Sequence, residues 1–572
     1  MSRRFAVVCL VVALCAVRVA MAQEPAAPKI TSWSNSKTGD KKTVFQVKPG
    51  QKITFSVKAE GAEKYRWEVN GIVQEGVGGA SFEWTVPDKS GIWKILVKTT
   101  NSTRNQLVDR RQAVEKRWIE KIPQGEGKDK FIQDMTDLGL YPPKGRKEWI
   151  VATFLTKVKP GESIQNAIDS LPHEGGIVEL SPGLHNVRKT IVINRSNVIV
   201  YGTRDSEVRN DSGKEIFVFY HESPRPKENW KKAPVLRNFL FKGFKLTKGV
   251  SSRGGIGILA WNIRDITIED ILAESQSLIA VNPTGGGSSA RSRNIVIKNN
   301  RVHNASLGCF HYSKNVYILE NIVQGTHAKI HTDRSCENVH IQGNHVDSTS
   351  RSYACIILDV GVYYEVRDNT LIGERWGLRI SAGVSHAIVQ NNTIAKARKA
   401  GVYFEPQFGV RNITLRGNFI HHNFGDGIFA RDIGYNMSGG SSVTVVNNIC
   451  CNNGGDGIKM NSEWYEFLKV TNNIIANNRG YGINRLKGKL LHGYNDVWNN
   501  SKGNYNGTSA GKGDISVNPL FADPAKGDFH LKSKAGRWDP RAKKWVKDNV
   551  HSPCIDAGDP KTDFSMEPAP NG

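Results

Sequence analysis

The sequence predicts an all-β protein in which a right-handed parallel β-solenoid follows a small β-sandwich. Eight asparagines recur at intervals of 21 to 30 residues, and each is followed two positions later by an apolar residue or Cys: Asn300, Asn321, Asn344, Asn369, Asn392, Asn418, Asn448 and Asn473. The segments around them alternate apolar and polar residues with period two, as in residues 411–420. A repeat this short with strand-like contents indicates one turn of a solenoid per repeat.

The recurring asparagines have a structural explanation. Asn tolerates the left-handed backbone conformation that a sharp corner requires. Its amide can also hydrogen-bond to the equivalent Asn one turn above and below. We therefore expect a ladder of stacked amides that stabilises the coil and does no chemistry.

The N-terminal residues predict export. Arg3 and Arg4 precede an apolar stretch from Phe5 to Val17, and the small residues Ala20 and Ala22 stand where a signal peptidase cleaves. We expect residues 1–22 to be a signal peptide and the mature protein to be secreted, periplasmic or on the cell surface. The apolar stretch is too short to span a bilayer, and no later segment is long and uncharged enough to do so.

The cysteines that remain after this cleavage show no paired CxxC spacing, so the sequence predicts no zinc site of that kind. We expect most of them to be small core residues, with one or two disulfides open to formation after export. The six are Cys309, Cys336, Cys355, Cys450, Cys451 and Cys554.

The charge of the chain predicts an anionic partner. Lys and Arg number 78 against 54 Asp and Glu, a net charge of +24. The leader contributes three of the arginines, so the mature chain carries +21. Such a surface attracts polyanions. Because the chain is exported and shows no nucleic-acid module, we expect an acidic polysaccharide rather than nucleic acid. A generally basic surface without a specific partner is the alternative.

Residues 29–98 contain five short alternating strands, with Asn70-Gly71 placed for a hairpin turn and Trp67 and Trp84 placed for a sandwich core. This pattern resembles the immunoglobulin-like domains of the polycystic-kidney-disease type in bacterial and archaeal surface proteins. The resemblance implies a spacer or a carbohydrate contact. Residues 99–150 are charged and weakly periodic, which indicates a linker, and residues 536–572 are expected to be a C-terminal tail.

A helix is expected at the start of the coil, because Ile164, Ala167, Ile168 and Leu171 share one helical face. The open end of a solenoid exposes unpaired strand edges, so this helix should cap it. The helix, the glycine-rich strands after it and the repeated unit resemble the right-handed parallel β-helix superfamily, which includes pectate-lyase-like enzymes. The match covers about residues 151–535. It implies the fold and not one activity, because enzymes, adhesins and phage spikes share this coil.

One face of the coil is expected to carry the chemistry. In residues 377–381, 401–405, 427–431 and 457–461 the second and fourth positions are apolar, so the third and fifth should face outward. The same register in residues 327–333 buries Ala328 and Ile330, whereas the register of residues 354–359 stays open. The outward set mixes cations with aromatic rings, as a groove for charged sugars requires. It comprises His327, Lys329, His331, Asp333, Arg379, Tyr403, Glu405, Phe429, Arg431, Lys459, Asn461 and Asn484.

These residues favour a polysaccharide lyase acting by β-elimination on a uronic-acid-containing polymer. Elimination requires neutralisation of the carboxylate, removal of the C5 proton and protonation of the departing 4-oxygen. We expect Arg379 or Arg431 to hold the carboxylate, Lys329 or His331 to take the proton, and Tyr403 to assist the leaving group. The expected substrate-binding residues are His327, Glu405, Phe429, Arg431, Lys459 and Asn461.

No cofactor is required by this scheme. Calcium replaces the arginine in several families of this fold, and Asp333 and Asp359 are the candidate calcium ligands, with Glu405 as a further oxygen donor.

Three alternatives stay open. A glycoside hydrolase would pair Glu405 with Asp359 or Asp333; residues 331–333 resemble the Asn-Thr-Asp segment of polygalacturonases, but residues 346–348 lack the paired aspartates expected one turn later. A uronate epimerase shares the proton abstraction, but the Asp-Pro-His motif of mannuronan epimerases is missing. A non-catalytic adhesion or glycan-binding protein would use the sandwich as a stalk and the coil as a rod. The long segments 224–234 and 282–293 favour a framed site over this last reading. The sequence makes no prediction of the oligomeric state.

Overall fold

The computed structural model describes residues 28–102, 145–219, 235–249, 255–281, 292–349, 353–381, 383–405, 409–431, 441–463 and 465–562. The predicted signal peptide, residues 103–144 of the predicted linker, and the segments 224–234 and 282–291 lie outside these residues.

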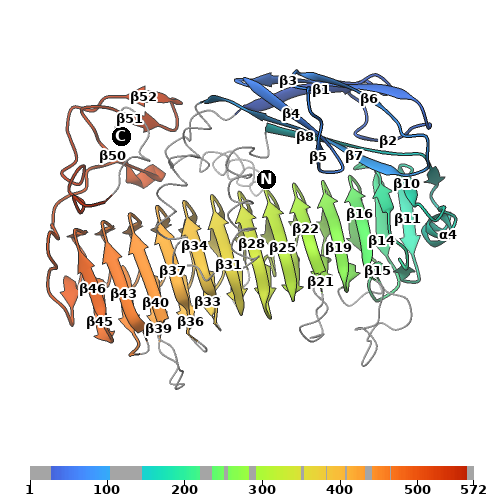
Figure 1. Cartoon of the computed structure of the whole chain (residues 1–572). Coiled ribbons are helices and arrows are strands. Elements are labelled where there is room, and N and C mark those ends of the chain that lie inside the picture. Colours follow the sequence, from blue (N-terminus) through green and yellow to red (C-terminus); the bar gives the residue numbers. More distant parts are fainter. Residues whose placement is uncertain are drawn as a thin grey trace, which may run out of the picture.

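The coil consists of three parallel sheets, which contain 14, 13 and 13 strands (Figure 1). Strand numbers within each sheet mostly rise by three, so each full turn adds one strand to every sheet. The chain is therefore a right-handed parallel β-helix protein, and the predicted fold class is confirmed.

Sheet I contains β9 (Leu155–Val158), β10 (Gly176–Leu180), β13 (Val198–Tyr201), β16 (Leu236–Lys242), β19 (Ile263–Glu269), β22 (Ser292–Lys298), β25 (Ser313–Leu319), β28 (Cys336–Gln342), β31 (Gly361–Arg367), β34 (Ser385–Gln390), β37 (Arg411–Arg416), β40 (Ser441–Val446), β43 (Tyr465–Thr471) and β46 (Leu490–Gly493). Sheet II contains β11 (Gly183–Val187), β14 (Ser206–Asn210), β17 (Lys245–Lys248), β20 (Leu272–Glu274), β23 (Arg301–His303), β26 (Ile322–Gly325), β29 (His345–Ser348), β32 (Thr370–Gly373), β35 (Thr393–Ala395), β38 (Phe419–His421), β41 (Ile449–Cys451), β44 (Ile474–Ala476) and β47 (Asp496–Trp498).

Sheet III contains β12 (Ile191–Val192), β15 (Phe217–Phe219), β18 (Ile256–Ala260), β21 (Ser277–Val281), β24 (Gly308–His311), β27 (Ile330–Asp333), β30 (Ala354–Asp359), β33 (Trp376–Ser381), β36 (Ala400–Glu405), β39 (Asp426–Arg431), β42 (Ile458–Asn461), β45 (Tyr481–Lys487) and β48 (Gly503–Asn506).

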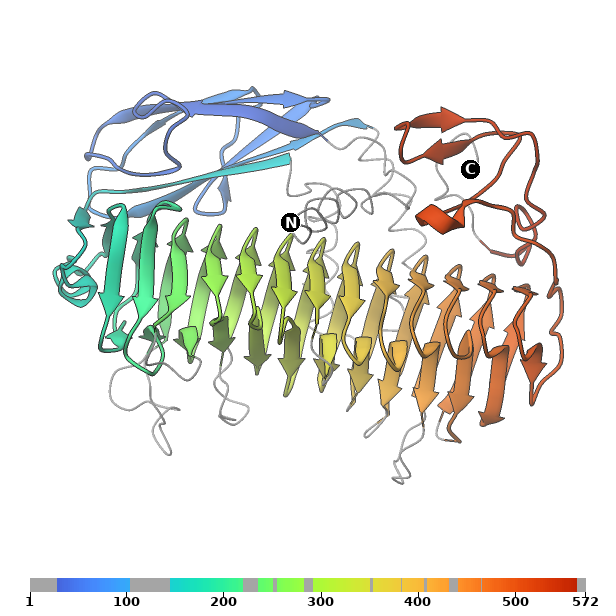
Figure 2. The same ribbon diagram turned by 180° about the vertical axis from the view of Figure 1, so that it is seen from behind.

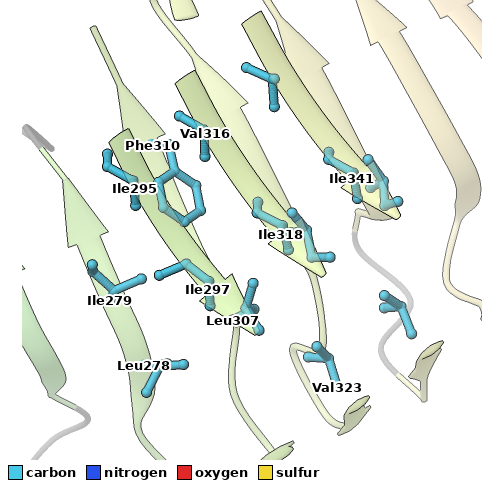
Figure 3. Packing of buried hydrophobic residues seen from close by; sticks show 14 of the residues in the cluster. Leu278, Ile279, Ile295, Ile297, Leu307, Phe310, Val316, Ile318, Val323 and Ile341 are labelled. Carbon is cyan, nitrogen blue, oxygen red and sulfur yellow. The ribbon is translucent and has the colours of Figure 1, made fainter. Parts of the chain in front are cut away.

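The interior of the coil is one continuous apolar core. Alternate residues of each strand point inward, and parallel pairing places like residues above one another, as with Ile297, Ile318 and Ile341 (Figure 3). Each fully buried aliphatic side chain contributes about 1.5–3 kcal/mol relative to its exposed state. Stacked columns of such residues fix the register, because a slip by one position would turn the apolar set outward.

The predicted asparagine ladder is present. The amide of each ladder Asn donates from Nδ2 to Oδ1 of the next, beginning with Asn300 to Asn321 at 3.0 Å and continuing past Asn473 to Asn495 at 3.0 Å. These asparagines are at most 2% exposed. The ladder therefore satisfies buried polar groups at the corner between sheets I and II, which supports the purely structural role that we expected.

The conformational role predicted for these asparagines is wrong in one respect. The residue with positive φ at each corner is the one immediately before the ladder Asn: Asn299, Glu320, Gly343, Asp368, Asn391, Gly417, Asn447 and Asn472. The corner thus divides two tasks between neighbours, since one residue adopts the left-handed conformation and the next supplies the stacking amide.

A second ladder, which the sequence analysis missed, stabilises the corner between sheets II and III. Asn423 donates to Asn453 at 2.9 Å, Asn453 to Asn478 at 2.9 Å, and Asn478 to Asn500 at 2.9 Å. All four are buried. Sheet III is therefore held rigidly against sheet II along β39, β42 and β45.

The predicted cap helix is α4 (Ile164–Asp169), which lies at the first turn of the coil. Ser163 is its N-cap, and the Ser163 hydroxyl accepts a hydrogen bond from the Asn166 N–H. Ile164, Ile168 and Leu171 join the core of the coil, so the helix covers the otherwise open end.

The N-terminal region is built from two sheets. One contains β1 (Lys29–Asn35), β3 (Lys52–Glu60) and β6 (Ser81–Thr85), and the other contains β2 (Val44–Gln46), β8 (Arg146–Ala152), β7 (Ile92–Thr100), β4 (Lys64–Val69) and β5 (Ile72–Val73). Trp67 and Trp84 are buried between them, as predicted. Strand β8 pairs with β7, so residues 146–150, which we expected in the linker, belong to this region. Its likeness to immunoglobulin-like domains stays a prediction.

This N-terminal region packs on the outer face of sheet I, as both views show (Figures 1 and 2). Val44 and Ala152 join Ile177, Ile199 and Leu240 of sheet I in one apolar cluster. Lys42 also bonds Glu179 at 3.0 Å. The N-terminal region therefore lies along the coil and does not project from it as a stalk.

The coil ends at β48, before the predicted boundary at residue 535. The chain then forms β49 (Phe521–Asp523), the 3-10 helix η4 (Pro524–Lys526), β50 (Asp528–Leu531), β51 (Arg537–Asp539) and β52 (Lys544–Val546). Phe521 and Phe529 pack on Phe419 and Cys451 of sheet II. The clusters that attach the two terminal regions therefore involve sheets I and II, while the expected functional residues lie on sheet III.

No helix among the residues that the structure describes has the length and apolar character needed to cross a membrane.

Candidate functional site

The outer face of sheet III carries two parallel columns of side chains, as the register predicted. The first column runs through Cys309, His331, Ile357, Arg379, Tyr403, Phe429, Lys459 and Asn484. The second column, two residues further along each strand, contains His311, Asp333, Asp359, Ser381, Glu405, Arg431 and Asn461. Ile356 and Leu358 lie in the core, so the register of residues 354–359 that the sequence left open places Ile357 and Asp359 outward.

Three aromatic rings on β33, β36 and β39 contact one another on this face. Trp376 lies parallel to Tyr403, with ring centroids 4.6 Å apart, and Tyr403 contacts Phe429 at 5.8 Å. The Tyr403 hydroxyl accepts a hydrogen bond from Arg431 Nη1 at 3.2 Å. Tyr403 is consequently only 2% exposed, and burial raises the pKa of its hydroxyl. Tyr403 therefore supports Arg431 and does not offer an open ring to a ligand.

Tyr353, which the sequence analysis did not single out, is the accessible aromatic ring beside this stack. It precedes β30 and is 39% exposed. Lys329 Nζ lies 5.3 Å from the ring centroid and the Arg379 guanidinium 5.6 Å from it. Arg379 Nη1 also donates to the Tyr353 hydroxyl at 3.5 Å. Two cations from different turns thus converge on one exposed ring.

Arg379 connects the two columns. Its Nε donates to Glu405 Oε2, its Nη2 forms an ion pair with the same oxygen at 2.7 Å, and its Nη1 lies 3.7 Å from Asp359 Oδ2. Burial alone would raise the pKa of Asp359, but hydrogen bonds from His331 and Ser381 and the charge of Arg379 outweigh it and lower that pKa. The side chains of Arg379, Asp359 and Glu405 are 12 to 16% exposed, so this network is fixed and largely dehydrated.

Cys309, His331 and Asp359 form a chain of contacts across three successive turns. His331 Nδ1 lies 3.5 Å from Cys309 Sγ, and His331 Nε2 lies 3.4 Å from Asp359 Oδ2. Burial alone would lower the pKa of His331, but its bonds to Asp359 and Cys309 raise the pKa to about 9. Burial alone would raise the pKa of Cys309, but bonds to His311 and His331 lower it to about 6. His331 is therefore a cation at neutral pH.

The remaining predicted residues are distributed along the same face. His327 is exposed on the turn before β27, with positive φ. Lys459 lies over the Phe429 ring at 5.3 Å and between two carboxylates, 3.8 Å from Asp426 Oδ2 and 3.7 Å from Asp456 Oδ2.

Two predicted outward residues differ in their surroundings. Asn461 is partly exposed opposite Arg431. Asn484 is buried and donates to Asp456 Oδ2 at 2.7 Å, so it supports the Asp456 carboxylate and does not face solvent.

The two candidate calcium ligands are already engaged. Asp333 accepts a hydrogen bond from the Arg334 N–H at 2.6 Å and lies 3.8 Å from His311 Nε2. Asp359 is bound by His331, Ser381 and Arg379. Within the described ranges, no group of three or more His, Cys, Asp or Glu side chains is arranged to hold a metal ion. Calcium binding stays a prediction.

The free thiols divide into two kinds. All six cysteines of the described coil and C-terminal region are unpaired, so neither of the disulfides that the sequence left open is formed. Cys336, Cys355, Cys450 and Cys451 are buried core residues, as expected. Cys309 departs from that expectation because it faces outward beside His331. The spacing of the cysteines could not reveal this, because His331 comes from the next turn of the coil.

The geometry defines a parallel β-helix protein with a basic and aromatic outer face on sheet III. Two family models match parts of this chain. Residues 384–558 match a family described as disaggregatase related, and residues 245–408 match the periplasmic copper-binding protein (NosD) family. Both are right-handed parallel β-helix families, in agreement with the fold of this chain. Because the described residues hold no fitting metal-ligand group, we derive no chemistry through copper.

Several solved structures share the coil. The A-module of the Azotobacter vinelandii mannuronan C-5 epimerase AlgE6 is 14% identical, with 62% of this chain and 94% of that chain covered and a TM-score of 0.36. The tailspike protein of E. coli bacteriophage HK620 is 13% identical, with coverage of 63% and 76% and a TM-score of 0.42. The Yersinia enterocolitica family 28 exopolygalacturonase is 10% identical, with coverage of 82% and 96% and a TM-score of 0.34. This likeness concerns the fold alone. Among curated proteins, none matches the chain.

Proposed function

We propose that this protein binds an acidic, uronic-acid-containing polysaccharide along the outer face of sheet III and cleaves it by β-elimination. The observation that carries the proposal is the convergence of Lys329 and Arg379 on the exposed ring of Tyr353, at 5.3 and 5.6 Å from its centroid. A sugar ring stacked on Tyr353 would place its carboxylate within reach of a guanidinium and an amine. The net charge of +21 on the chain without its leader favours the approach of such a polymer.

Each step of the elimination has a candidate residue. Arg379 and the exposed Arg431 neutralise the uronate carboxylate, which makes the neighbouring C5 proton acidic. Lys329, in its neutral amine form, removes that proton. The Tyr353 hydroxyl, which accepts a hydrogen bond from Arg379, protonates the departing 4-oxygen. Tyr353 replaces Tyr403 in this role, because Tyr403 is 2% exposed and its hydroxyl is occupied by Arg431.

His331 is better suited to binding than to proton removal. Its pKa of about 9, raised by Asp359 and Cys309 against the effect of burial, keeps the imidazole protonated at neutral pH. A protonated imidazole holds no lone pair with which to accept the C5 proton. It can instead add to the positive potential that attracts the polymer.

A hydrolase is less well supported by these contacts. Hydrolysis of a glycosidic bond needs one protonated and one ionised carboxyl group. Asp359 has a lowered pKa, and Glu405 accepts one hydrogen bond from the Arg379 cation and is paired with it at 2.7 Å. Neither is arranged to hold the proton that a general acid must donate.

The test is incubation of the mature protein with pectate, alginate, chondroitin and heparan-type polymers while ultraviolet absorbance is followed. A lyase produces an unsaturated sugar that absorbs. New reducing ends without absorbance would replace the proposal with a hydrolase. Binding without any turnover would leave a glycan-binding protein. Repeating the assay with a calcium chelator distinguishes neutralisation by Arg379 and Arg431 from neutralisation by calcium.

We also propose that the protein acts outside the cytoplasm after removal of residues 1–22. The basis is the leader pattern of the sequence. Sequencing the N-terminus of the protein recovered from a periplasmic or culture fraction tests this, and recovery only of full-length protein from the cytoplasm would contradict it.

A further inference from the structure

We propose that Cys309, His331 and Asp359 form a nucleophilic site for acyl transfer, which hydrolyses a carboxylic ester through a thioester on Cys309. This activity is separate from the elimination proposed above. Assigning the ester to a polysaccharide would rest on the proposed function, whereas the thiol chemistry does not.

The three residues have the arrangement that nucleophilic catalysis requires. A nucleophile must lie within reach of a base, and a third group must orient that base. His331 Nδ1 lies 3.5 Å from Cys309 Sγ, while His331 Nε2 lies 3.4 Å from Asp359 Oδ2 on the opposite side of the ring. The imidazole is therefore held between the thiol and the carboxylate. Asp359 is itself fixed by Ser381 and Arg379.

The environment of Cys309 stabilises a thiolate. The groups that face it are His311 on its own strand β24, with Nε2 at 3.0 Å from Sγ, and His331 on β27. Asp333 Oδ2 lies 3.8 Å from the same His311 Nε2. Strand β21, on the other side, contributes the apolar Ala280. The lowered pKa of Cys309, about 6, agrees with this arrangement of donors. A protonated imidazole, here His331, next to a half-buried thiol is a usual source of a reactive cysteine.

The other cysteines provide a contrast within the same chain. Burial raises the pKa of the Cys336 thiol to about 12, and it also raises the pKa values of Cys355, Cys450 and Cys451. Cys554 is partly exposed, but burial and the neighbouring Asp496 raise its pKa. Among the described cysteines, Cys309 is thus the one whose surroundings favour the thiolate.

The reaction balances without any redox partner. The Cys309 thiolate attacks the ester carbonyl, a C–S bond forms and the C–O bond to the alcohol breaks. The His331 imidazolium gives its Nδ1 proton to the departing alkoxide and becomes neutral. Neutral His331 then takes a proton from water, and the hydroxide attacks the thioester. The carboxylic acid leaves, and the thiolate and imidazolium are restored. Asp359 keeps the His331 ring oriented during both the formation and the hydrolysis of the thioester.

The first experiment measures thiol reactivity with iodoacetamide between pH 5.5 and 9 and locates the label by mass spectrometry. We expect Cys309 to be alkylated at pH 7 at least about 10-fold faster than Cys554, with a pH midpoint near 6. His331→Gln should move that midpoint up toward the range of an ordinary thiol. Equal labelling of Cys309 and Cys554, or an unshifted midpoint in the variant, would overturn the proposal.

The second experiment uses p-nitrophenyl acetate and requires no polysaccharide, so its failure is distinct from failure of the lyase assay. We expect release of p-nitrophenol and a trapped acetyl group on Cys309 after acid quench. Cys309→Ser should reduce turnover at least about 100-fold while the circular dichroism spectrum stays unchanged. Asp359→Asn should reduce turnover less and flatten the pH profile. Full turnover in Cys309→Ser, or acetyl on another residue, would refute the assignment.

Discussion

Arg379 donates a hydrogen bond from Nε to Glu405 Oε2 at 2.9 Å, and its Nη2 forms an ion pair with the same carboxylate oxygen at 2.7 Å. The two residues lie on adjacent turns, on β33 and β36. With Nε and Nη2 at Glu405, Nη1 is directed toward Asp359 and Tyr353. Glu405 therefore sets the orientation of the guanidinium that we expect to meet the substrate carboxylate.

We predict that Glu405→Gln lowers the stability of the protein by about 1.5–3 kcal/mol, the cost of losing a half-buried charge-assisted hydrogen bond. Thermal unfolding followed by circular dichroism measures the loss. The matched control is Glu83→Gln, because Glu83 pairs with Lys52 on the surface with both side chains more than half exposed. Exposed pairs contribute about 0–1 kcal/mol. Equal effects of the two substitutions would contradict the role assigned to Glu405.

The asparagine ladder predicts a larger loss from a residue with no chemical role. Asn369 donates to Ile341 O and Asn392 Oδ1 and accepts from the backbone and amide of Asn344. Asn369→Ala leaves several buried polar groups without hydrogen-bond partners. Each such group lowers the stability of the protein by about 1–3 kcal/mol. We expect a clear fall in the unfolding temperature. Asn186→Ala, at an exposed position of β11, should change it little. A small effect at Asn369 would mean that water replaces the ladder.

The attachment of the C-terminal region should depend on pH through His421. The His421 ring lies 4.4 Å from Phe419 and 5.3 Å from Phe529, and burial, with the charges of His422 and Lys396, lowers its pKa to about 3. In the unfolded chain the pKa is about 6.5. Since the folded value is the lower one, this contribution to stability is complete above pH 6.5 and is lost as the pH falls toward 3.

The measurement for this prediction is limited proteolysis of residues 507–562 at pH 7 and pH 4.5. The wild-type protein should be cleaved faster in this region at the lower pH. His421→Phe cannot take up a proton, so it should be cleaved at similar rates at both values. Acid-enhanced cleavage of equal size in the variant would show that another group controls the attachment.

The sequence predicted the columns of sheet III because the asparagine period fixes the phase of every strand that follows a corner. Arg379, Phe429 and Arg431 could therefore be placed on one face from their spacing alone. Burial of Tyr403 could not be predicted, because Trp376 covers it from the neighbouring turn at a position just before the phased glycine. Tyr353 was missed because it lies before its strand. Outside a strand, the alternation of apolar and polar residues does not tell which way a side chain points.

The contacts of the thiol site could not be predicted from the sequence either. Each of Cys309, His331 and Asp359 looks ordinary in its own repeat, and their contacts exist only between turns. A register predicts which residues stack, but Cys309 stood in a repeat that was not phased, so its column neighbour was not known. Contacts between turns can be predicted only when the inward and outward positions of every strand are known.

The last prediction concerns the two residues that would perform the elimination. Lys329→Ala removes the proposed base and Tyr353→Phe removes only the proposed acid, while its ring stays in place for stacking. General acid or base catalysis contributes about 10²–10⁴-fold to a rate. We expect kcat on the cleaved polymer to fall by a factor of this order in each variant, with KM nearly unchanged for Tyr353→Phe. Tyr353→Leu, which also removes the ring, should raise KM. Lys48→Ala, in the N-terminal region, is the control for loss of a surface charge. Full activity of Lys329→Ala would remove Lys329 from the site, and an unchanged kcat in Tyr353→Phe would return the acid role to another hydroxyl.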